Sequence, residues 1–265
     1  MKNSIKIKCP AKINLNLKIT GKREDGFHNI ESIMQTISLF DYLLITAEDY
    51  TENKIILTGN SDEIPYDEHN LVYKAVKLFL DKTGVVNKKI TIDIEKNIPV
   101  CAGLAGGSTD GAGTIFGLNE IFETNFSEKK LDELCASLGS DLNVCLHGGR
   151  ILAKGRGEII EQLPFEEFNV SLIKPINLGI SAKEAYTKYS QKKERAVNIN
   201  FENDLEWAVI DDYKELQYLK EKYPKSVMTG SGSTYFVIDE EFENEKNFWI
   251  KNNLKSINYG VTVIN

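Results

Sequence analysis

A glycine-rich segment in the middle of the chain constrains its fold more than any other feature. Residues 99–113, PVCAGLAGGSTDGAG, hold five glycines in fifteen positions. Before them, residues 90–94 alternate isoleucine with polar residues at the period of a strand, which Pro99 prevents from continuing. After them, apolar residues recur at helical spacing over 108–123, and Ser108 is a suitable N-cap. The sequence therefore predicts a strand, a glycine-rich loop and a helix.

A glycine-rich loop that leads into a helix favours the binding of phosphate. The first N–H groups of a helix lack intrahelical partners, and the helix dipole adds about half a positive charge there. The segment does not match the Walker A loop, because no Lys-Ser or Lys-Thr follows its glycines. The dinucleotide pattern counted from Gly103 finds Ala105 and Ser108 where glycines are required. From these residues alone, an anion-binding loop and a closely packed turn both remain open.

The composition excludes several classes of function. The 265 residues carry a net charge of −7, which gives no basic footprint for nucleic acid. No run of residues is apolar enough to span a membrane, and residues 1–19 lack the pattern of a signal peptide. The four cysteines are isolated, which favours small buried side chains over a metal site or disulfides. We therefore expect a cytoplasmic protein with neither nucleic acid nor membrane as partner.

The order of predicted elements indicates an α+β protein in which strands and helices interleave without strict βαβ regularity. We expect strands at 4–19 (interrupted at 9–15), 42–49, 53–59, 89–96, 170–175, 226–238 and 257–265. We expect helices at 71–83, 108–123, 128–138, 204–223 and 240–254, the first capped by Asn70 and ended by Gly84. A boundary near residue 165 would divide the chain into domains 1–165 and 166–265.

Three motifs resemble, in order and spacing, the signatures of the GHMP small-molecule kinases. They are PAKINLNL at 10–17, the glycine-rich segment at 99–113 and MTGSGSTYFVI at 228–238. Further motifs are similar to the branch of this family whose substrate carries a cytidine, and they lie at 23–32, 138–158 and 174–186. The resemblance covers nearly the whole chain.

The resemblance implies an enzyme of two α+β domains, the first like ribosomal protein S5 and the second a ferredoxin-like sandwich with antiparallel sheets. It implies transfer of the γ-phosphoryl group of ATP to the 2-hydroxyl of a cytidine diphosphate methylerythritol, which is a precursor of isoprenoids. Mg²⁺ would accompany ATP. The expected oligomeric state is a monomer or a weak homodimer.

The same resemblance assigns roles to individual residues. Asp141 would accept the hydroxyl proton, and Lys12 would be its cationic partner. Asn14 would bind substrate, and Phe27, His28 and Tyr186 would hold the cytosine ring. ATP would be bound by the glycine-rich loop, namely by Pro99, Val100, Cys101, Ala102, Gly103, Leu104, Ala105, Gly106, Gly107, Ser108 and Thr109.

Three residues at the end of the loop receive separate expectations. Ser108 and Thr109 are candidates for the magnesium or its waters, although either could merely cap the helix. We expect Asp110 to interact with the helix N-terminus and to take no part in the chemistry.

Several alternatives stay open. From the residues alone, core packing is the better interpretation of Phe27 and Tyr186, and Lys12 and Asp141 would be a surface lysine and a helix cap. The chain departs from the family pattern at Cys101, Ala105, Asn143, Arg150 and Ala182. The remaining functional alternatives are a sister kinase acting on homoserine, mevalonate or a sugar, and a non-catalytic sensor of the same fold.

Overall fold

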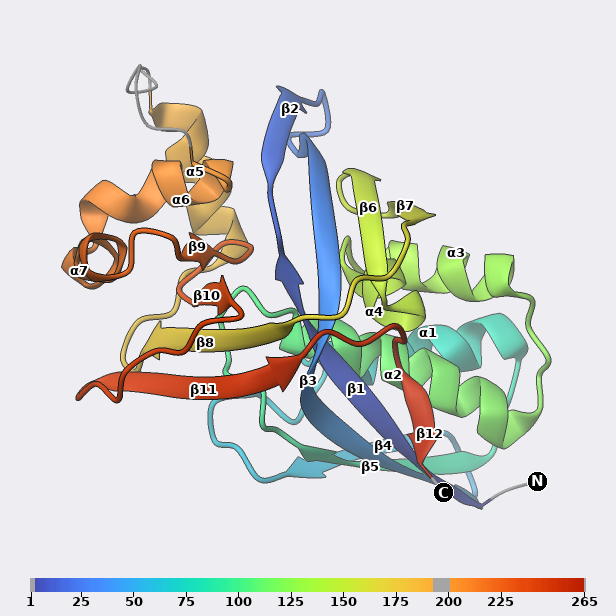
Figure 1. Ribbon diagram of the computed structural model, residues 1–265. Helices are drawn as coiled ribbons and strands as arrows, with labels where there is room; N and C mark the ends of the chain where they lie inside the picture. The colour runs from blue at the N-terminus through green and yellow to red at the C-terminus, as the bar shows by residue number, and fades with distance from the viewer. Residues whose placement is uncertain (1–2, 193–200, 265) are drawn as a thin grey trace.

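Two sheets organise the chain in the computed structural model, which describes residues 3–192 and 201–264 (Figure 1). The first sheet has eight strands in the order β12-β1-β3-β5-β4, while β2 and β6 also pair with β3, and β7 pairs with β6. All its pairings are antiparallel except that of β4 with β5. Its strands are β1 (Ser4–Asn14), β2 (Lys18–Lys22), β3 (His28–Asp49), β4 (Lys54–Gly59), β5 (Lys88–Glu95), β6 (Arg150–Gly155), β7 (Ile159–Gln162) and β12 (Thr262–Ile264).

The second sheet has four antiparallel strands in the order β11-β8-β10-β9. They are β8 (Asn169–Pro175), β9 (Val227–Met228), β10 (Tyr235–Ile238) and β11 (Phe248–Lys255). Figure 1 shows the later helices beside this sheet, namely α5 (Ala182–Gln191), α6 (Asp204–Val209), the 3-10 turn η1 (Ile210–Asp212) and α7 (Lys214–Lys222). The described elements confirm the predicted α+β class. The boundary near residue 165 falls between β7 and β8, and the division into two domains stays a prediction.

Four helices gather on one side of the first sheet (Figure 1). They are α1 (Leu71–Thr83), α2 (Gly106–Phe122), α3 (Glu128–Leu138) and α4 (Leu142–His147). Glycines let α2 approach β1 and β3 closely: a Cβ built on Gly113 would lie 2.5 Å from Cys9 Sγ, and one on Gly117 would lie 2.6 Å from Ile45 Cδ1. Gly113 and Gly117 therefore serve close packing of α2 on the sheet, which fixes where the helix lies relative to β1 and β3.

The ends of the helices test the local sequence signals. As predicted, the Asn70 side chain accepts a hydrogen bond from Val72 N–H at 2.9 Å, and Gly84 ends α1 with a φ of 69°. The start predicted for α2 is wrong. This helix begins at Gly106, with Ala105 in the left-handed region at φ 60°, so Ser108 lies inside the first turn and is not the N-cap.

The helix predicted for residues 240–254 is also wrong. Strand β11 starts at Phe248 and pairs with the free edge of β8, where its run of aromatic and β-branched residues fits a pleated surface. The helix predicted over 204–223 is divided, because Tyr213 adopts an extended backbone between η1 and α7. The interruption expected within 9–15 is only a register shift between Pro10 and Ala11 inside a continuous β1.

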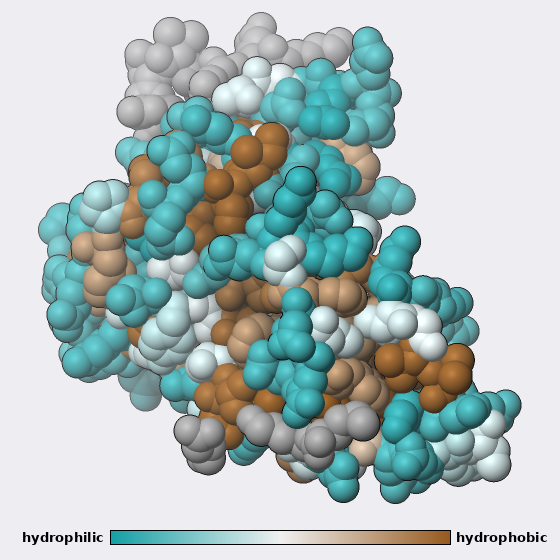
Figure 2. Space-filling model, turned by 90° about the vertical axis from the view of Figure 1, so that its right-hand side faces the viewer, coloured by the Kyte–Doolittle hydropathy of each residue, from teal (hydrophilic) through white to brown (hydrophobic). Residues whose placement is uncertain are grey.

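The helices and the surface agree with the composition. No helix in the described ranges, 3–192 and 201–264, combines the length and the apolar character needed to cross a membrane. Figure 2 shows the face that carries α3 and the chain termini, where hydrophilic residues surround separate hydrophobic patches.

Candidate active site

One cavity of about 1210 Å³ brings the predicted site residues together. It is lined both by residues that precede the boundary near 165 and by residues that follow it, including Gly230 and Ser231 of the third motif. Thr109 is the exception among the predicted residues, because it is fully buried and does not line the cavity. Those that line it are Lys12, Asn14, Phe27, His28, Pro99, Val100, Cys101, Ala102, Gly103, Leu104, Ala105, Gly106, Gly107, Ser108, Asp141 and Tyr186.

The ammonium of Lys12 forms an ion pair with Asp141, with Nζ 3.4 Å from Oδ2. Lys12 is only 3% exposed, and its Nζ also donates to Asn14 Oδ1 at 2.7 Å and to Gly103 O at 3.2 Å. Asp141 occupies the N-cap position of α4, as the alternative supposed, but its side chain makes no capping hydrogen bond to the helix. The carboxylate is 29% exposed, so it can meet both the buried ammonium and a molecule in the cavity.

Asn14 connects this pair to the other two motifs. It lies two residues beyond Lys12 on β1, so both side chains share one face of the strand. Its Nδ2 donates to Ser32 Oγ at 2.8 Å, and its backbone N–H donates to Thr229 Oγ1 at 2.9 Å. Thr229 also donates to Gly103 O at 3.3 Å. The observed partners of Asn14 thus orient Lys12, and its predicted contact with substrate stays a prediction.

The glycine-rich loop reaches α2 through left-handed backbone conformations at Cys101, Gly103 and Ala105, with φ of 50°, 74° and 60°. Only glycine fits at 103, because a Cβ there would lie 2.0 Å from Thr229 O. A Cβ on Gly107 would meet nothing within 4 Å. The first N–H groups of α2 therefore lie in an open part of the cavity wall, which suits an anion.

A buried charge cluster lies beneath the start of α2, and sequence reasoning missed it. Lys96 Nζ donates to Asp110 Oδ2 at 2.8 Å and forms an ion pair with Asp41. Burial raises the pKa of Asp110 to about 7, and the neighbouring Asp41 adds to this effect while Lys96 opposes it. Asp110 thus pairs with Lys96, which corrects the expectation that it interacts with the helix N-terminus. A Cβ on Gly106 would lie 3.1 Å from Lys96 Nζ, so the cluster adjoins the loop.

The three residues predicted to hold a base lie at the cavity with different surroundings. The rings of His28 and Tyr186 stack, with centroids 5.3 Å apart and planes at 17°. Burial, with a smaller contribution from Lys22, lowers the pKa of His28, so the ring is neutral near pH 7. Phe27 is 53% exposed, so core packing is the wrong interpretation for it. Tyr186 is partly buried against a hydrophobic cluster that includes Ile180 and Leu205, and it also lines the cavity.

Comparison with known proteins places this geometry in a family. A family model described as the GHMP kinases N terminal domain matches residues 70–149. A 4-diphosphocytidyl-2-C-methyl-D-erythritol kinase of Clostridium tetani (strain Massachusetts / E88) is 39% identical over 256 residues, which cover 88% of this chain and 90% of that one. The chain belongs to this kinase family. A kinase of the same name from Prochlorococcus marinus (strain MIT 9215) is 37% identical, with coverage of 91% and 87%.

Solved structures show that the GHMP kinase fold is shared more widely. A crystal structure of 4-(cytidine 5'-diphospho)-2C-methyl-D-erythritol kinase superimposes with a TM-score of 0.74 at 24% identity, covering 95% of this chain and 99% of that one. Homoserine kinase from Cytophaga hutchinsonii gives a TM-score of 0.76 at 16% identity, covering 100% and 98%. At these identities the likeness concerns the fold alone, so the fold does not discriminate between the substrates of the two kinases.

Three departures from the kinase family pattern now have structural surroundings. Asn143 is buried and donates to Glu158 O at 3.1 Å. Arg150 forms an ion pair with Glu166 and does not line the large cavity. Ser181, beside Ala182, lines the cavity, but its hydroxyl accepts from Glu184 N–H at 3.2 Å as the cap of α5.

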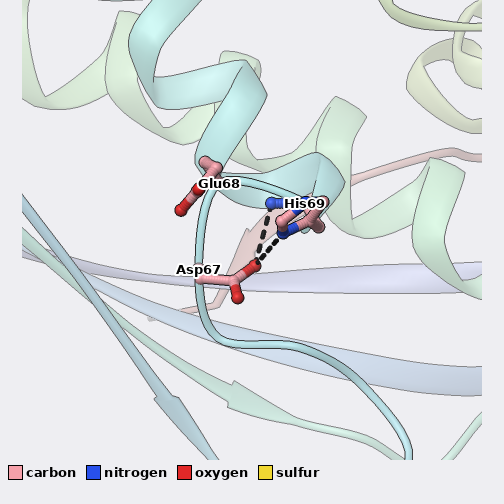
Figure 3. A group of neighbouring side chains, drawn as sticks. All are labelled: Asp67, Glu68 and His69. Carbon is pink, nitrogen blue, oxygen red and sulfur yellow. Dashed lines mark hydrogen bonds and ion pairs between the residues drawn. The ribbon is translucent and has the colours of Figure 1, made fainter.

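Three neighbouring residues in the loop before α1 carry groups that metals bind, and Figure 3 shows how they lie. Asp67 Oδ1 accepts from the backbone N–H of His69 at 2.9 Å and lies 2.9 Å from its Nδ1. That backbone hydrogen bond is the largest cause lowering the pKa of Asp67. All three residues, including Glu68, are exposed. The contact between Asp67 and the backbone N–H of His69 accounts for the turn that brings His69 to the cavity wall.

Proposed function

We propose that this chain uses ATP to phosphorylate the 2-hydroxyl of 4-diphosphocytidyl-2-C-methyl-D-erythritol, in the non-mevalonate route to isoprenoids. The curated relatives at 37% and 39% identity carry the name of this kinase. The observation that carries the proposal is the pair of Lys12 and Asp141, 3.4 Å apart in a cavity that also contains an anion-binding loop. A hydroxyl, a phosphate chain and a base then each have a complementary part of one cavity.

The proposed chemistry follows from the surroundings of the pair. The 2-hydroxyl oxygen attacks the γ-phosphorus of ATP, the bond to the bridging β,γ-oxygen breaks, and the hydroxyl proton passes to Asp141. The buried ammonium of Lys12 keeps the carboxylate ionised and stabilises negative charge on the transferred group. Its contacts with Asn14 and Gly103 hold the ammonium in place before the substrate arrives.

The glycine-rich loop fits the phosphates of ATP. Because Gly106 starts α2, the N–H groups of Gly106, Gly107 and Ser108 lack helical partners and suit phosphate oxygens. Gly107 leaves open space at the cavity wall, so a phosphate can approach the backbone closely. Thr109 is buried away from the cavity, so the contact with ATP expected for it finds no support.

The residues present also fit a magnesium ion held mainly by the phosphates. Ser108 lines the cavity at the end of the loop, whereas Thr109 does not, so Ser108 is the better of the two candidate ligands. When bound, Mg²⁺ neutralises charge on the phosphate oxygens. The same proposal has the enzyme work in the cytoplasm on small molecules, as a monomer or a weak homodimer. Light scattering on the purified chain would test the oligomeric state.

The decisive experiment measures ATP consumption with a panel of acceptors. We expect turnover with the cytidine diphosphate methylerythritol substrate and a kcat/KM far below that value with homoserine, mevalonate and simple sugars. A higher kcat/KM for one of those acceptors would replace the proposal with the sister-kinase alternative. Tight binding of ATP and of the cytidine substrate without turnover would instead establish the sensor. Phosphorus NMR of the product would confirm that the 2-hydroxyl is the acceptor.

A further inference from the structure

The turn between β6 and β7 brings an arginine into the large cavity. Arg156 lines the cavity, and its guanidinium carbon lies 5.1 Å from the centroid of the Phe27 ring. Its Nε is 3.7 Å from Glu158 Oε1, and its backbone N–H donates to Glu158 Oε2. Within residues 3–192 and 201–264, neither Nη atom of Arg156 has a hydrogen bond to the protein. The guanidinium is thus supported by a ring and keeps donors for another molecule.

The backbone of this turn fixes where the arginine stands. Gly155 and Gly157 have φ of 70° and 124°, which are conformations that side chains disfavour. A Cβ on Gly157 would lie 3.2 Å from Ser140 O and 3.4 Å from Asp141 Oδ1. Arg156 therefore lies next in the chain to Gly157, the residue beside the Asp141 carboxylate, and its side chain contacts the Phe27 ring. Arg156 thus lies between the position proposed for the 2-hydroxyl of the substrate, at Asp141, and the position proposed for the cytosine, at Phe27.

The neighbouring charges leave this cation available. The backbone N–H of Phe27 and the guanidinium of Arg23 lower the pKa of Asp25, and Arg156 contributes least to this effect. Asp25 thus already has a nearer partner in Arg23, at 3.0 Å. Glu158 holds the Nε side and leaves the two terminal nitrogens. Lys22 also lines the cavity, so a second cation lies on the same side as His28. A chain with a net charge of −7 presents a local positive group at this position.

We propose that Arg156 binds the diphosphate that joins the two ends of the substrate. This inference rests on the proposed function, because only that substrate places a diphosphate between a base and a reacting hydroxyl. A guanidinium donates two parallel N–H groups to phosphate oxygens, a geometry that lysine cannot reproduce. The same two donors could meet N3 and O2 of cytosine, but the adjacency of Gly157 to Asp141 favours the middle of the substrate.

Binding measurements on fragments of the substrate test the assignment without turnover. Calorimetry compares CDP, CMP and cytidine on the full chain, with a non-hydrolysable ATP analogue filling the nucleotide site. We expect Arg156→Gln to weaken CDP binding by about 10- to 100-fold, as for the loss of a charged hydrogen-bonding group, and to leave cytidine binding nearly unchanged. Arg156→Lys should fall between, because it keeps the charge and loses the planar pair of donors.

The matched control is Lys154→Gln, which removes one positive charge from the same hairpin at an exposed position outside the cavity. It should bind CDP like the original chain. If Arg156→Gln is folded, binds the ATP analogue and retains full CDP affinity, the assignment of Arg156 is overturned and the proposed function still stands. Equal losses for CDP and cytidine overturn it in favour of a contact with the base. If the unmodified chain binds ATP but neither CDP nor cytidine, the proposed function fails, and this inference fails with it.

Discussion

Lys12 and Asp141 meet at 3.4 Å, the first on β1 of the eight-stranded sheet and the second immediately before the short helix α4. Both helix and strand pack against α2, so the position of the pair depends on the packing of the core and not on a loop. Lys12 is held by three oxygen atoms, whereas Asp141 keeps part of its carboxylate exposed. This asymmetry suits a fixed cation and a proton acceptor.

Replacing Asp141 by asparagine should lower kcat by about 10²- to 10⁴-fold, because the shape is kept and the proton acceptor is lost. ATP affinity should persist, since Asp141 makes no contact with the glycine-rich loop in the proposed arrangement. Steady-state kinetics and calorimetry measure the two effects. The control is Asp81→Asn, an equivalent change at an exposed position of α1. Turnover of Asp141→Asn close to that of the original enzyme would contradict the assigned role.

The pair should also behave as a unit. Lys12→Met removes the cation that faces Asp141, and it leaves Asn14 Oδ1 and Gly103 O without the donor they share. We expect kcat to fall by a factor similar to that of Asp141→Asn, and the double variant to lose little more than the worse single variant. The free energy of unfolding should fall by about 1–3 kcal/mol, since the Thr229 hydroxyl, 3.3 Å from both acceptors, can donate to only one of them and the other is left unsatisfied. Multiplied losses in the double variant would show that the two residues act independently.

Two glycines of the loop should respond differently to a side chain. Gly107→Val should weaken ATP binding while the fold persists, because open space lies at its α-carbon and a branched side chain there blocks close approach of a phosphate. Gly103→Ala should destabilise the protein, because its φ is 74° and its Cβ would collide with Thr229 O. Thermal melts and calorimetry separate the two effects. Unchanged ATP affinity in a folded Gly107→Val variant would refute the phosphate loop.

Gly106→Val should weaken ATP binding and destabilise the fold. A valine would disfavour a positive φ and would block close approach to the backbone, but Gly106 is not among the residues with positive φ, so only the second effect applies. Its Cβ would instead lie 3.1 Å from both Lys96 Nζ and Ile98 Cγ2. We still expect weaker ATP binding, now with lower stability, because the buried cluster beneath the loop must move.

Stability should depend on pH through Asp110. Its pKa is raised to about 7 in the folded chain, whereas an unfolded aspartate titrates near 3.8. Between these values the folded state holds a proton that the unfolded state has released, so this group makes the folded state less stable as pH rises. We expect Asp110→Asn to become more stable relative to the original chain as the pH rises from 4 to 7. The difference between their free energies of unfolding should change by at least about 1 kcal/mol over this range. A difference that stays constant across this range would contradict the raised pKa.

The sequence predicts those features whose cause lies in neighbouring residues. It does not predict features that arise from contacts with distant segments of the chain. Asn70 and Gly84 mark the ends of α1 because capping depends on a few adjacent residues. Strand β11 was predicted as a helix because only the free edge of β8 makes it a strand. The ion pairs of Lys96 join residues 55 and 14 positions away, so no short motif marks them. The predicted residues that line the cavity were found because short motifs carry them. Lys12 and the glycine-rich loop lie in the first two kinase motifs, and Asp141, His28 and Tyr186 lie in the further motifs at 138–158, 23–32 and 174–186.

The last prediction concerns discrimination between cytidine and uridine. His28 is only 9% exposed, and its ring stacks on that of Tyr186. Its pKa is lowered by burial, so the ring is neutral near pH 7, with one nitrogen that accepts a hydrogen bond and one that donates. Stacking cannot distinguish the two pyrimidines, whereas a buried hydrogen-bonding edge can do so by factors of up to about 10⁴.

We therefore expect the chain to prefer the cytidine substrate over its uridine counterpart, and His28→Ala to narrow the ratio of their kcat/KM values. The control is Tyr186→Phe, which keeps the stacking and removes only a hydroxyl, and it should preserve the ratio. Because the folded ring is neutral at pH 7, the preference should hold at that pH and weaken as the medium becomes acidic enough to protonate His28. Equal use of both nucleotides by the original enzyme would contradict a cytidine pocket at His28 and would favour the sister-kinase alternative.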